Sequence, residues 1–175
     1  MKKNRVVKEI FWWVRSLALG VIIAIILNTT VFANAVVISG SMENTIMTDS
    51  RVFGTRLAYI FNEPERFDVI LFDDPNNKSD IPLLKRIIGL PNETVEIIDG
   101  KVYINGSDTA LDDSFIKEEA RGSFGPFDVP EGCYFVLGDN RNYSHDSKNW
   151  VNSFVSIENI LGKVFIVYYP TPKIF

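Results

Sequence analysis

Residues Leu83–Leu90 read LLKRIIGL, an apolar run interrupted by two adjacent basic residues, Lys85 and Arg86. Large and β-branched apolar residues in a run of this length favour a β-strand. Neighbouring side chains of a strand point to opposite faces. We therefore expect one of the two basic side chains to face the core or a cleft and the other to face outward. For Lys85 the simpler alternative is a side chain whose stem lies along the surface.

Segments of the same kind recur along most of the chain, whereas no sustained helical period follows residue 35. Asp99-Gly100 separates two of them and is typical of a two-residue hairpin turn. Short helices are expected near Met42–Met47 and Ser156–Ile160, and the polar stretches Asp73–Asp80 and Asp108–Gly125 are interpreted as surface insertions. The sequence predicts a mainly β fold, with strands at Arg66–Phe72, Leu83–Leu90, Thr94–Asp99, Lys101–Asn105, Cys133–Leu137 and Gly162–Tyr169.

The N-terminal segment differs from the rest because it is apolar over a long stretch. Residues Leu17–Leu27 (LALGVIIAIIL) are continuously apolar, and with their flanks they exceed the roughly 20 residues needed to span a bilayer. Basic residues precede the segment and none directly follows it, which places the N-terminus in the cytoplasm. We predict a cytoplasmic N-terminus at residues 1–9, a transmembrane helix at residues 10–35 and an extracytoplasmic domain at residues 36–175.

A cleavable secretory signal peptide is the main alternative for this segment. A basic start, an apolar core and Ala33-Asn34-Ala35 also fit that description. Both interpretations export the rest of the chain. We favour a retained helix, because a cut after Ala35 would detach the motif that begins at Ser39 from the membrane. A buried core helix is a third alternative, and the asymmetric charge around the segment argues against it.

The composition excludes several classes of function. The chain has 175 residues, of which 46% are apolar and 23% charged, so it is not a disordered segment. Its one cysteine, Cys133, excludes an internal disulfide, and with His145 as the one histidine a tetrahedral zinc site is not expected. No metal or other cofactor is predicted. Residues 36–175 are strongly acidic overall, which argues against nucleic-acid binding.

Two further segments are rich in residues that carry chemistry. Ser39-Gly40-Ser41-Met42 (SGSM) follows the apolar segment, and taken alone such a stretch is usually only a turn. Gly138–Ser147 (GDNRNYSHDS) follows an apolar strand, and its many short polar side chains indicate a tightly hydrogen-bonded loop.

Together these segments resemble the bacterial type I signal peptidases. That family carries S-x-S-M beside its membrane anchor, a K-R pair leading into G-L-P, and G-D-N-R followed by S-x-D-S. This chain has SGSM at 39–42, KRIIGLP at 85–91 and GDNRNYSHDS at 138–147, with a further similar strand, FDVILF, at 67–72. The order of the segments matches along nearly the whole chain.

The resemblance implies a fold and an activity. The fold is a signal-peptidase-like β-barrel or sandwich catalytic domain with one N-terminal transmembrane helix. The activity is that of a serine endopeptidase in the cell membrane, which removes signal peptides from exported precursor proteins and cuts after small residues at −1 and −3. The implied partners are those signal peptides and the lipid bilayer, without nucleic acid.

The resemblance also implies roles for individual residues. Ser41 is the nucleophile, Lys85 is its general base, and Ser144 orients the lysine amine. Ser39 offers its hydroxyl, with the Ser41 backbone N–H, to the oxyanion. Arg141 and Asp146 form a structural ion pair that supports the loop, and the substrate pocket is lined by Val37, Ile38, Met42 and Leu84. His145 is expected to be a loop residue and not a base.

The proposed base makes physical sense only with a lowered pKa. A serine hydroxyl is a poor nucleophile until a neighbouring base removes its proton. A free lysine has a pKa near 10.4 and is almost entirely charged at pH 7. Burial lowers that pKa because it disfavours the charged form. The apolar neighbours of Lys85 on the strand predict this kind of environment.

Two positions depart from the family pattern. Asn44 stands where the family usually has proline after its first motif, and Lys148 stands where the last motif usually has arginine. Lysine lacks the bidentate fork of arginine, so support for Asp146 is expected to be weaker. Two other functions remain as alternatives: a catalytically weak or dedicated relative that assists the assembly of surface proteins, and a self-cleaving Ser-Lys repressor, which would need a DNA-binding unit in place of the membrane span.

Overall fold

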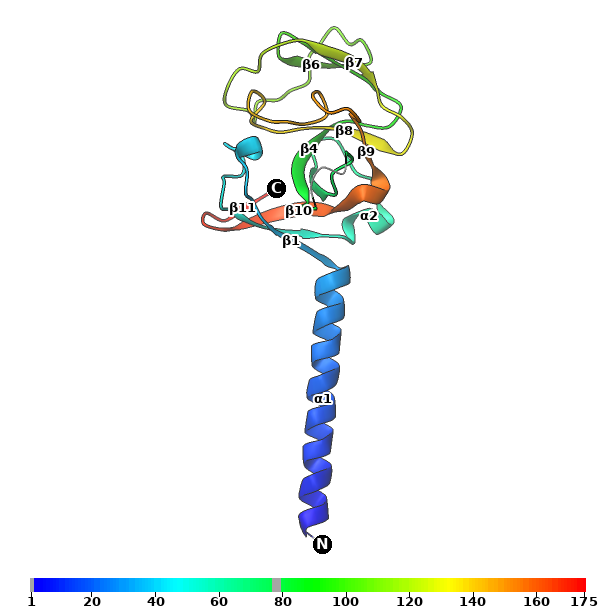
Figure 1. The fold of residues 1–175 in the computed structure, drawn as a ribbon, viewed down its shortest axis with the longest axis vertical. Coiled ribbons are helices and arrows are strands. Elements are labelled where there is room, and N and C mark those ends of the chain that lie inside the picture. The colour runs from blue at the N-terminus through cyan, green and yellow to red at the C-terminus, as the bar shows by residue number, and fades with distance from the viewer. Residues whose placement is uncertain (1, 77–79) are drawn as a thin grey trace.

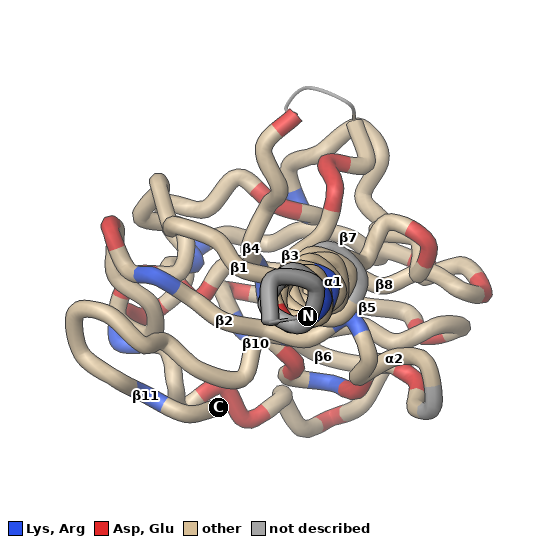
Figure 2. The backbone as a smooth tube through the Cα atoms, turned by 90° about the horizontal axis from the view of Figure 1, so that it is seen from below, with Lys and Arg blue, Asp and Glu red and all other residues tan. Residues whose placement is uncertain are grey.

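A computed structural model describes residues 2–76 and 80–175, and it consists of one long helix and a β body (Figure 1). Helix α1 (Lys2–Thr30) contains an apolar window, Lys8–Asn28, in which no residue is buried. Its 21 residues extend about 32 Å at 1.5 Å per residue, close to the thickness of a bilayer core. In the view along this helix (Figure 2), acidic and basic residues are spread over the loops of the body around it.

The helix ends earlier than the sequence predicted. Residues Phe32–Val36 form strand β1, which pairs antiparallel with β2 (Arg51–Thr55), whereas the prediction placed residues 32–35 inside the membrane span. Ala33 is buried in the core beneath this pairing. The sheet therefore begins two residues after the helix ends. A signal-peptide cut after Ala35 would remove most of an edge strand from the sheet.

The body is built on a curled eight-stranded sheet with the order β1-β2-β10-β3-β4-β8-β9, in which β11 also pairs with β10. A second sheet has three strands in the order β6-β5-β7. Every pairing is antiparallel, as expected for a mainly β chain with short connections. The remaining strands are β3 (Val69–Phe72), β4 (Leu83–Gly89), β5 (Thr94–Ile98), β6 (Lys101–Ile104), β7 (Phe124–Asp128), β8 (Cys133–Leu137), β9 (Val155–Ser156), β10 (Ile160–Tyr169) and β11 (Lys173–Ile174). The short helices are η1 (Gly40–Met42), α2 (Ala58–Phe61) and η2 (Ile157–Asn159).

The predicted hairpin turn at Asp99-Gly100 is confirmed. It joins β5 to β6, with Ile98 opposite Lys101. Both turn residues have positive φ, 48° and 81°, as a tight hairpin turn of this kind requires. Only glycine fits at position 100, because a Cβ there would lie 1.9 Å from the carbonyl oxygen of Ala120.

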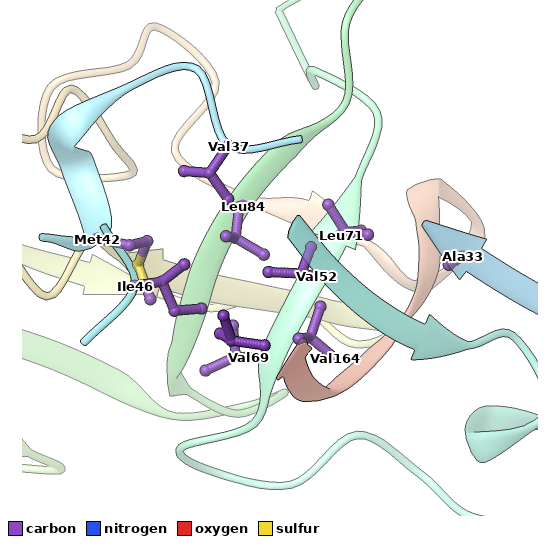
Figure 3. Close-up of a cluster of buried hydrophobic side chains, with 10 residues drawn as sticks. Ala33, Val37, Met42, Ile46, Val52, Val69, Leu71, Leu84 and Val164 are labelled. Carbon is purple, nitrogen blue, oxygen red and sulfur yellow. The ribbon is translucent and has the colours of Figure 1, made fainter. Parts of the chain in front are cut away.

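Strand β4 lies in the interior of the curled sheet and carries the two basic residues. It pairs with β3 on one edge, Lys85 opposite Ile70, and with β8 on the other, where pairing starts at Arg86 opposite Leu137. One apolar cluster lies beneath the start of this strand (Figure 3), where Val37, Leu84 and Met42 come together from three separate segments. This cluster gives the residues around Ser41 and Lys85 a rigid base.

Candidate active site

Ser41 lies in the short helix η1, held between a buried methionine and a loop. Its side chain is 8% exposed, and its hydroxyl oxygen lies 3.3 Å from that of Ser39, the one hydrogen-bond partner it has among the described residues. The next residue, Met42, is fully buried in the core. Met42 therefore anchors the turn, and it is not among the residues that line the two cavities beside Ser41, so its predicted place in the substrate pocket stays a prediction.

The loop after β8 binds the backbone of this turn directly. The Asn140 backbone N–H donates to the Ser41 carbonyl at 3.0 Å, and the Asn140 side-chain amide donates to the Gly40 carbonyl at 2.9 Å. Gly138 allows the close approach, because a Cβ at that position would lie 2.4 Å from the Ser41 oxygen and 2.3 Å from the Ser144 hydroxyl. The sequence predicted a hydrogen-bonded loop here, and the structure shows that its partner is Ser41.

Lys85 is buried in an environment that disfavours its charge. The residue is 4% exposed. The pKa of its amine is lowered from 10.5 to about 8, mainly by burial; the nearby Asp146 and Asp139 act to raise the pKa, and Lys148 acts to lower it. The direction agrees with the one expected from the apolar neighbours of Lys85 in the sequence.

Arg86 points to the other face of β4 and is also buried, at 8% exposed. The expectation that one of the two basic side chains faces outward is therefore wrong, because both faces of this strand are covered. The Arg86 guanidinium donates to both carboxylate oxygens of Asp139, at 2.8 and 2.6 Å, and to the Phe67 carbonyl at 2.8 Å. The ring of Phe115 covers it, with 4.4 Å between the guanidinium carbon and the ring centroid.

The expected ion pair between Arg141 and Asp146 is replaced by two other pairs. Arg141 donates to Asp113 at 3.1 Å, and Asp146 accepts from Lys148 at 2.9 Å. The second oxygen of Asp146 accepts the Gly138 backbone N–H at 3.0 Å. Lys148, two residues further along the chain, pairs with Asp146. Arg141 pairs instead with Asp113, which comes from the segment before β7. Burial lowers the pKa of Arg141, and its Nε and Nη2 have no hydrogen-bond partner in the described part of the chain.

Ser144 and His145 occupy different environments. The Ser144 hydroxyl is buried and, within residues 2–76 and 80–175, has no hydrogen-bond partner, so the expected bond to the Lys85 amine is not formed. His145 is exposed and lines a cavity beside Ser41. Nor does a hydrogen bond join the Lys85 amine to the Ser41 hydroxyl among these residues. Such contacts are often long in a free enzyme and shorten when the substrate binds.

Two cavities meet at Ser41 and Lys85, because both residues line each of them. The smaller cavity, of about 130 Å³, is lined by further apolar residues and by Val37, Ile38 and Leu84, the residues that the sequence analysis expects in the substrate pocket. The larger cavity, of about 740 Å³, is lined by both apolar and polar residues, among them three carboxylates. Among the described residues, no group of three or more His, Cys, Asp or Glu residues is placed to hold a metal ion.

The segment interpreted as a surface insertion contributes to the support of the site. Phe115 lies near two guanidinium groups, with its ring 4.4 Å from the Arg86 carbon and 5.9 Å from that of Arg141. The neighbouring Asp113 pairs with Arg141. The polar composition of Asp108–Gly125 hid this role, and the one signal in the sequence was an aromatic residue inside a charged stretch.

Asn44 occupies a backbone conformation that explains its presence. Its φ is 79°, in the left-handed region, which asparagine tolerates better than most residues. Proline, with φ fixed near −65°, cannot adopt it. The turn after Met42 is therefore built differently here from one that carries proline at this position.

Comparisons with known proteins find a matching family, similar proteins and a similar crystal structure. The family described as "Signal peptidase, peptidase S26" matches residues 10–169. "Probable signal peptidase I-2" of Synechocystis sp. is 36% identical over 165 residues, covering 91% of this chain and 73% of the relative. "Signal peptidase I" of Bacillus licheniformis is 33% identical over 181 residues, covering 99% and 94%. A crystal structure of a signal peptidase I from Enterococcus faecalis V583 has 36% sequence identity and a TM-score of 0.47, covering 58% of this chain and 97% of that one.

Proposed function

This chain belongs to the signal peptidase family, peptidase S26, and on that premise we propose that Ser41 and Lys85 form the dyad with which it works. The chain is a serine endopeptidase of the signal peptidase I type, which removes signal peptides from precursor proteins. One observation carries the assignment of the dyad: a buried lysine and a serine hydroxyl line the same two cavities, where a peptide can reach both.

In this proposal the neutral Lys85 amine takes the proton of the Ser41 hydroxyl as its oxygen attacks the carbonyl carbon of the scissile bond. The Ser41 backbone N–H and the Ser39 hydroxyl receive the oxyanion, and the lysine ammonium then protonates the leaving amine. Water hydrolyses the resulting acyl ester in a second step. With a pKa of about 8, half of the amine is neutral at pH 8, against about one in 250 for a free lysine.

We assign Ser144 the task of orienting the Lys85 amine once the substrate has closed the site. Its hydroxyl is buried beside Gly138 and has no other partner among the described residues, so it is available to the amine. Arg141 and Asp146 support the same loop through Asp113 and Lys148.

The substrate is proposed to bind as an added strand at the edge of β4. Pairing with β8 starts only at Arg86, so residues 83–85 have no strand partner on that edge in the described structure. Residues 35–39 form the opposite wall of the small cavity. An extended peptide bound between these segments would place alternate side chains in a space of about 130 Å³. Small residues fit this space at −1 and −3, and aromatic residues do not.

The membrane arrangement follows from the helix. Signal peptidase I relatives are membrane-anchored, and α1 is long and apolar enough to cross a bilayer. We propose that the basic start of the chain stays in the cytoplasm and the β body lies on the other side. Confinement to the membrane surface raises the effective concentration of precursors there.

Cleavage of a purified precursor that ends in Ala-x-Ala tests this proposal. We expect the full-length protein to release the mature chain, and we expect Ser41→Ala and Lys85→Met to lower kcat/KM at least about a thousandfold. Lys101→Met, at an exposed position on β6, is the matched control and should cleave normally. Normal processing by Ser41→Ala would contradict the dyad and favour a non-catalytic role in the assembly of surface proteins.

A further inference from the structure

The larger cavity beside Ser41 differs in charge from the small apolar one. Three carboxylates line it, from Glu43 after η1, Asp74 after β3 and Glu118 between β6 and β7. The basic groups in its described lining are Lys85, which is buried with a lowered pKa, and the imidazole of His145. The described part of its lining is therefore acidic overall, and we call this cavity of about 740 Å³, within the size range of sites that bind ligands, the acidic compartment.

The sheet determines which part of a bound peptide enters this compartment. An added strand can follow β4 only along residues 83–85, because β8 occupies the edge from Arg86 onward. Ser41 and Lys85 lie where this free edge ends and where the two cavities meet. If the small side chains before the scissile bond occupy the small cavity, the residues after the bond must leave β4 and enter the acidic compartment.

Glu43 is held close to the reacting group. A Cβ on Gly40 would lie 2.8 Å from the carboxyl carbon of Glu43, so the carboxylate lies against the backbone between Ser39 and Ser41. The Thr48 hydroxyl donates to it at 2.9 Å and fixes its position. Positive charge on the peptide just beyond the scissile bond is therefore favoured here.

A second observation points to a bound peptide in the same compartment. The Lys85 amine, on a residue that is 4% exposed, lines the cavity and makes no hydrogen bond with any described residue. The side chain is buried but its amine is open to the cavity, so a partner for the amine can come only from that side. The missing partner is supplied when a peptide lies across Ser41 and the amine meets the reacting groups.

We propose that the acidic compartment binds the first residues of the mature chain and selects basic side chains there, at positions +1 to +3. This inference rests on the proposed function, because it assumes that the bond is cut at Ser41. It adds a charge preference for the residues after the scissile bond, which do not enter the small apolar cavity.

Three precursors that differ only at +2 and +3, carrying Lys, Gln or Glu at both positions, test the inference with the full-length protein. We expect kcat/KM to fall in the order Lys, Gln, Glu, with about tenfold between the extremes at low salt. The difference should shrink at about 0.5 M salt, because exposed charges are then screened. Glu118→Lys should abolish or reverse the preference, Glu118→Gln should reduce it, and Glu131→Gln, in an exposed turn outside the cavity, should preserve it.

The outcomes separate the two proposals. Equal kcat/KM for all three precursors would overturn the charge preference while leaving the dyad intact. A preference that survives unchanged in Glu118→Lys and in Asp74→Asn would overturn its assignment to these carboxylates. Cleavage that persists in Ser41→Ala would instead overturn the proposed dyad.

Discussion

Two adjacent basic residues lie on opposite faces of β4, and their environments in the described part of the chain differ: one side chain is paired and the other is not. On one face Arg86 gives hydrogen bonds to both oxygens of Asp139 and to a carbonyl, beneath the ring of Phe115. On the other face Lys85 is buried to a similar extent, yet it has no hydrogen bond among the described residues and faces two cavities. The two residues are adjacent in the sequence, but they differ in their hydrogen-bond partners and in their access to the cavities.

This difference shows how a buried cation is accommodated in a small β fold. A buried charge must be paired or must be lost by a shift in pKa. Arg86 is paired with Asp139, so it can hold the loop that binds the Ser41 backbone. Lys85 is left without a direct partner, its pKa falls to about 8, and the neutral amine becomes available as a base.

The largest effect on stability is expected when the ion pair between Arg86 and Asp139 is broken. Arg86→Met leaves the buried carboxylate of Asp139 without its cation and should lower the free energy of unfolding by about 3–5 kcal/mol, measured by urea denaturation. Arg121→Met, at an exposed position, should change it by less than about 0.5 kcal/mol. A small loss for Arg86→Met, comparable to that of Arg121→Met, would show that the pair does not support the fold.

On the unpaired face the same substitution should have the opposite sign. The folded state holds the Lys85 amine at a pKa of about 8 and the unfolded chain near 10.5, so the unfolded state binds more protons between these values. The penalty of burial is therefore complete below pH 8 and disappears as the pH rises toward 10.5. Lys85→Met should raise the free energy of unfolding at pH 7 by about 3 kcal/mol, and the gain should vanish near pH 10.5. A destabilised Lys85→Met at pH 7 would contradict the comparison.

A smaller loss of stability is expected when the ring of Phe115 beside Arg86 is replaced. Phe115→Leu removes the ring beside Arg86 and Arg141 while keeping an apolar side chain, and should cost about 1 kcal/mol of stability. Phe115→Tyr keeps the ring and should cost less. Equal losses in the two variants, measured by urea denaturation, would show that the ring itself does not stabilise the guanidinium groups.

The smallest effect is expected at Lys148, whose positive charge lowers the pKa of Lys85 and neutralises Asp146. Lys148→Gln removes both influences, so the pKa of Lys85 should rise and the pH profile of kcat should move to higher pH. At pH 7.5 the rate should fall about two- to fivefold, and it should recover at higher pH. A fall in rate that does not recover would indicate damage to the loop instead of a shifted titration.

The sequence predicted the parts of the fold that depend on local pattern. The strands at 69–72, 83–89, 94–98, 101–104, 133–137 and 160–169 overlap the expected ones, and the Asp99-Gly100 turn is where it was predicted. Strands β1, β2, β7, β9 and β11 were missed, and for β1 and β7 the physical reason is clear. Phe32–Val36 continues the apolar segment of the helix, and Phe124–Asp128 contains a glycine and a proline that weaken the pattern of a strand.

The site was predictable as a set of residues but not as a set of partners. The motifs identified Ser41, Lys85 and the loop at 138–147, and the structure brings them together. The pairing of Arg141 with Asp113, the contact of Phe115 with Arg86 and the burial of both faces of β4 depend on segments far apart in the sequence. Alternation along one strand cannot reveal what covers its two faces.

The central claim is that the unpaired amine on β4 titrates far below a free lysine, so that about a fifth of it is neutral at pH 7.4, against about one in a thousand for a free lysine. Titration of the Lys85 side-chain nitrogen by NMR, in full-length protein labelled at lysine and compared with Lys85→Met for assignment, measures it directly. The account predicts a midpoint near pH 8, well below those of the exposed lysines. A midpoint near 10.5 would contradict it, because the amine would then be charged and unable to act as the base for Ser41.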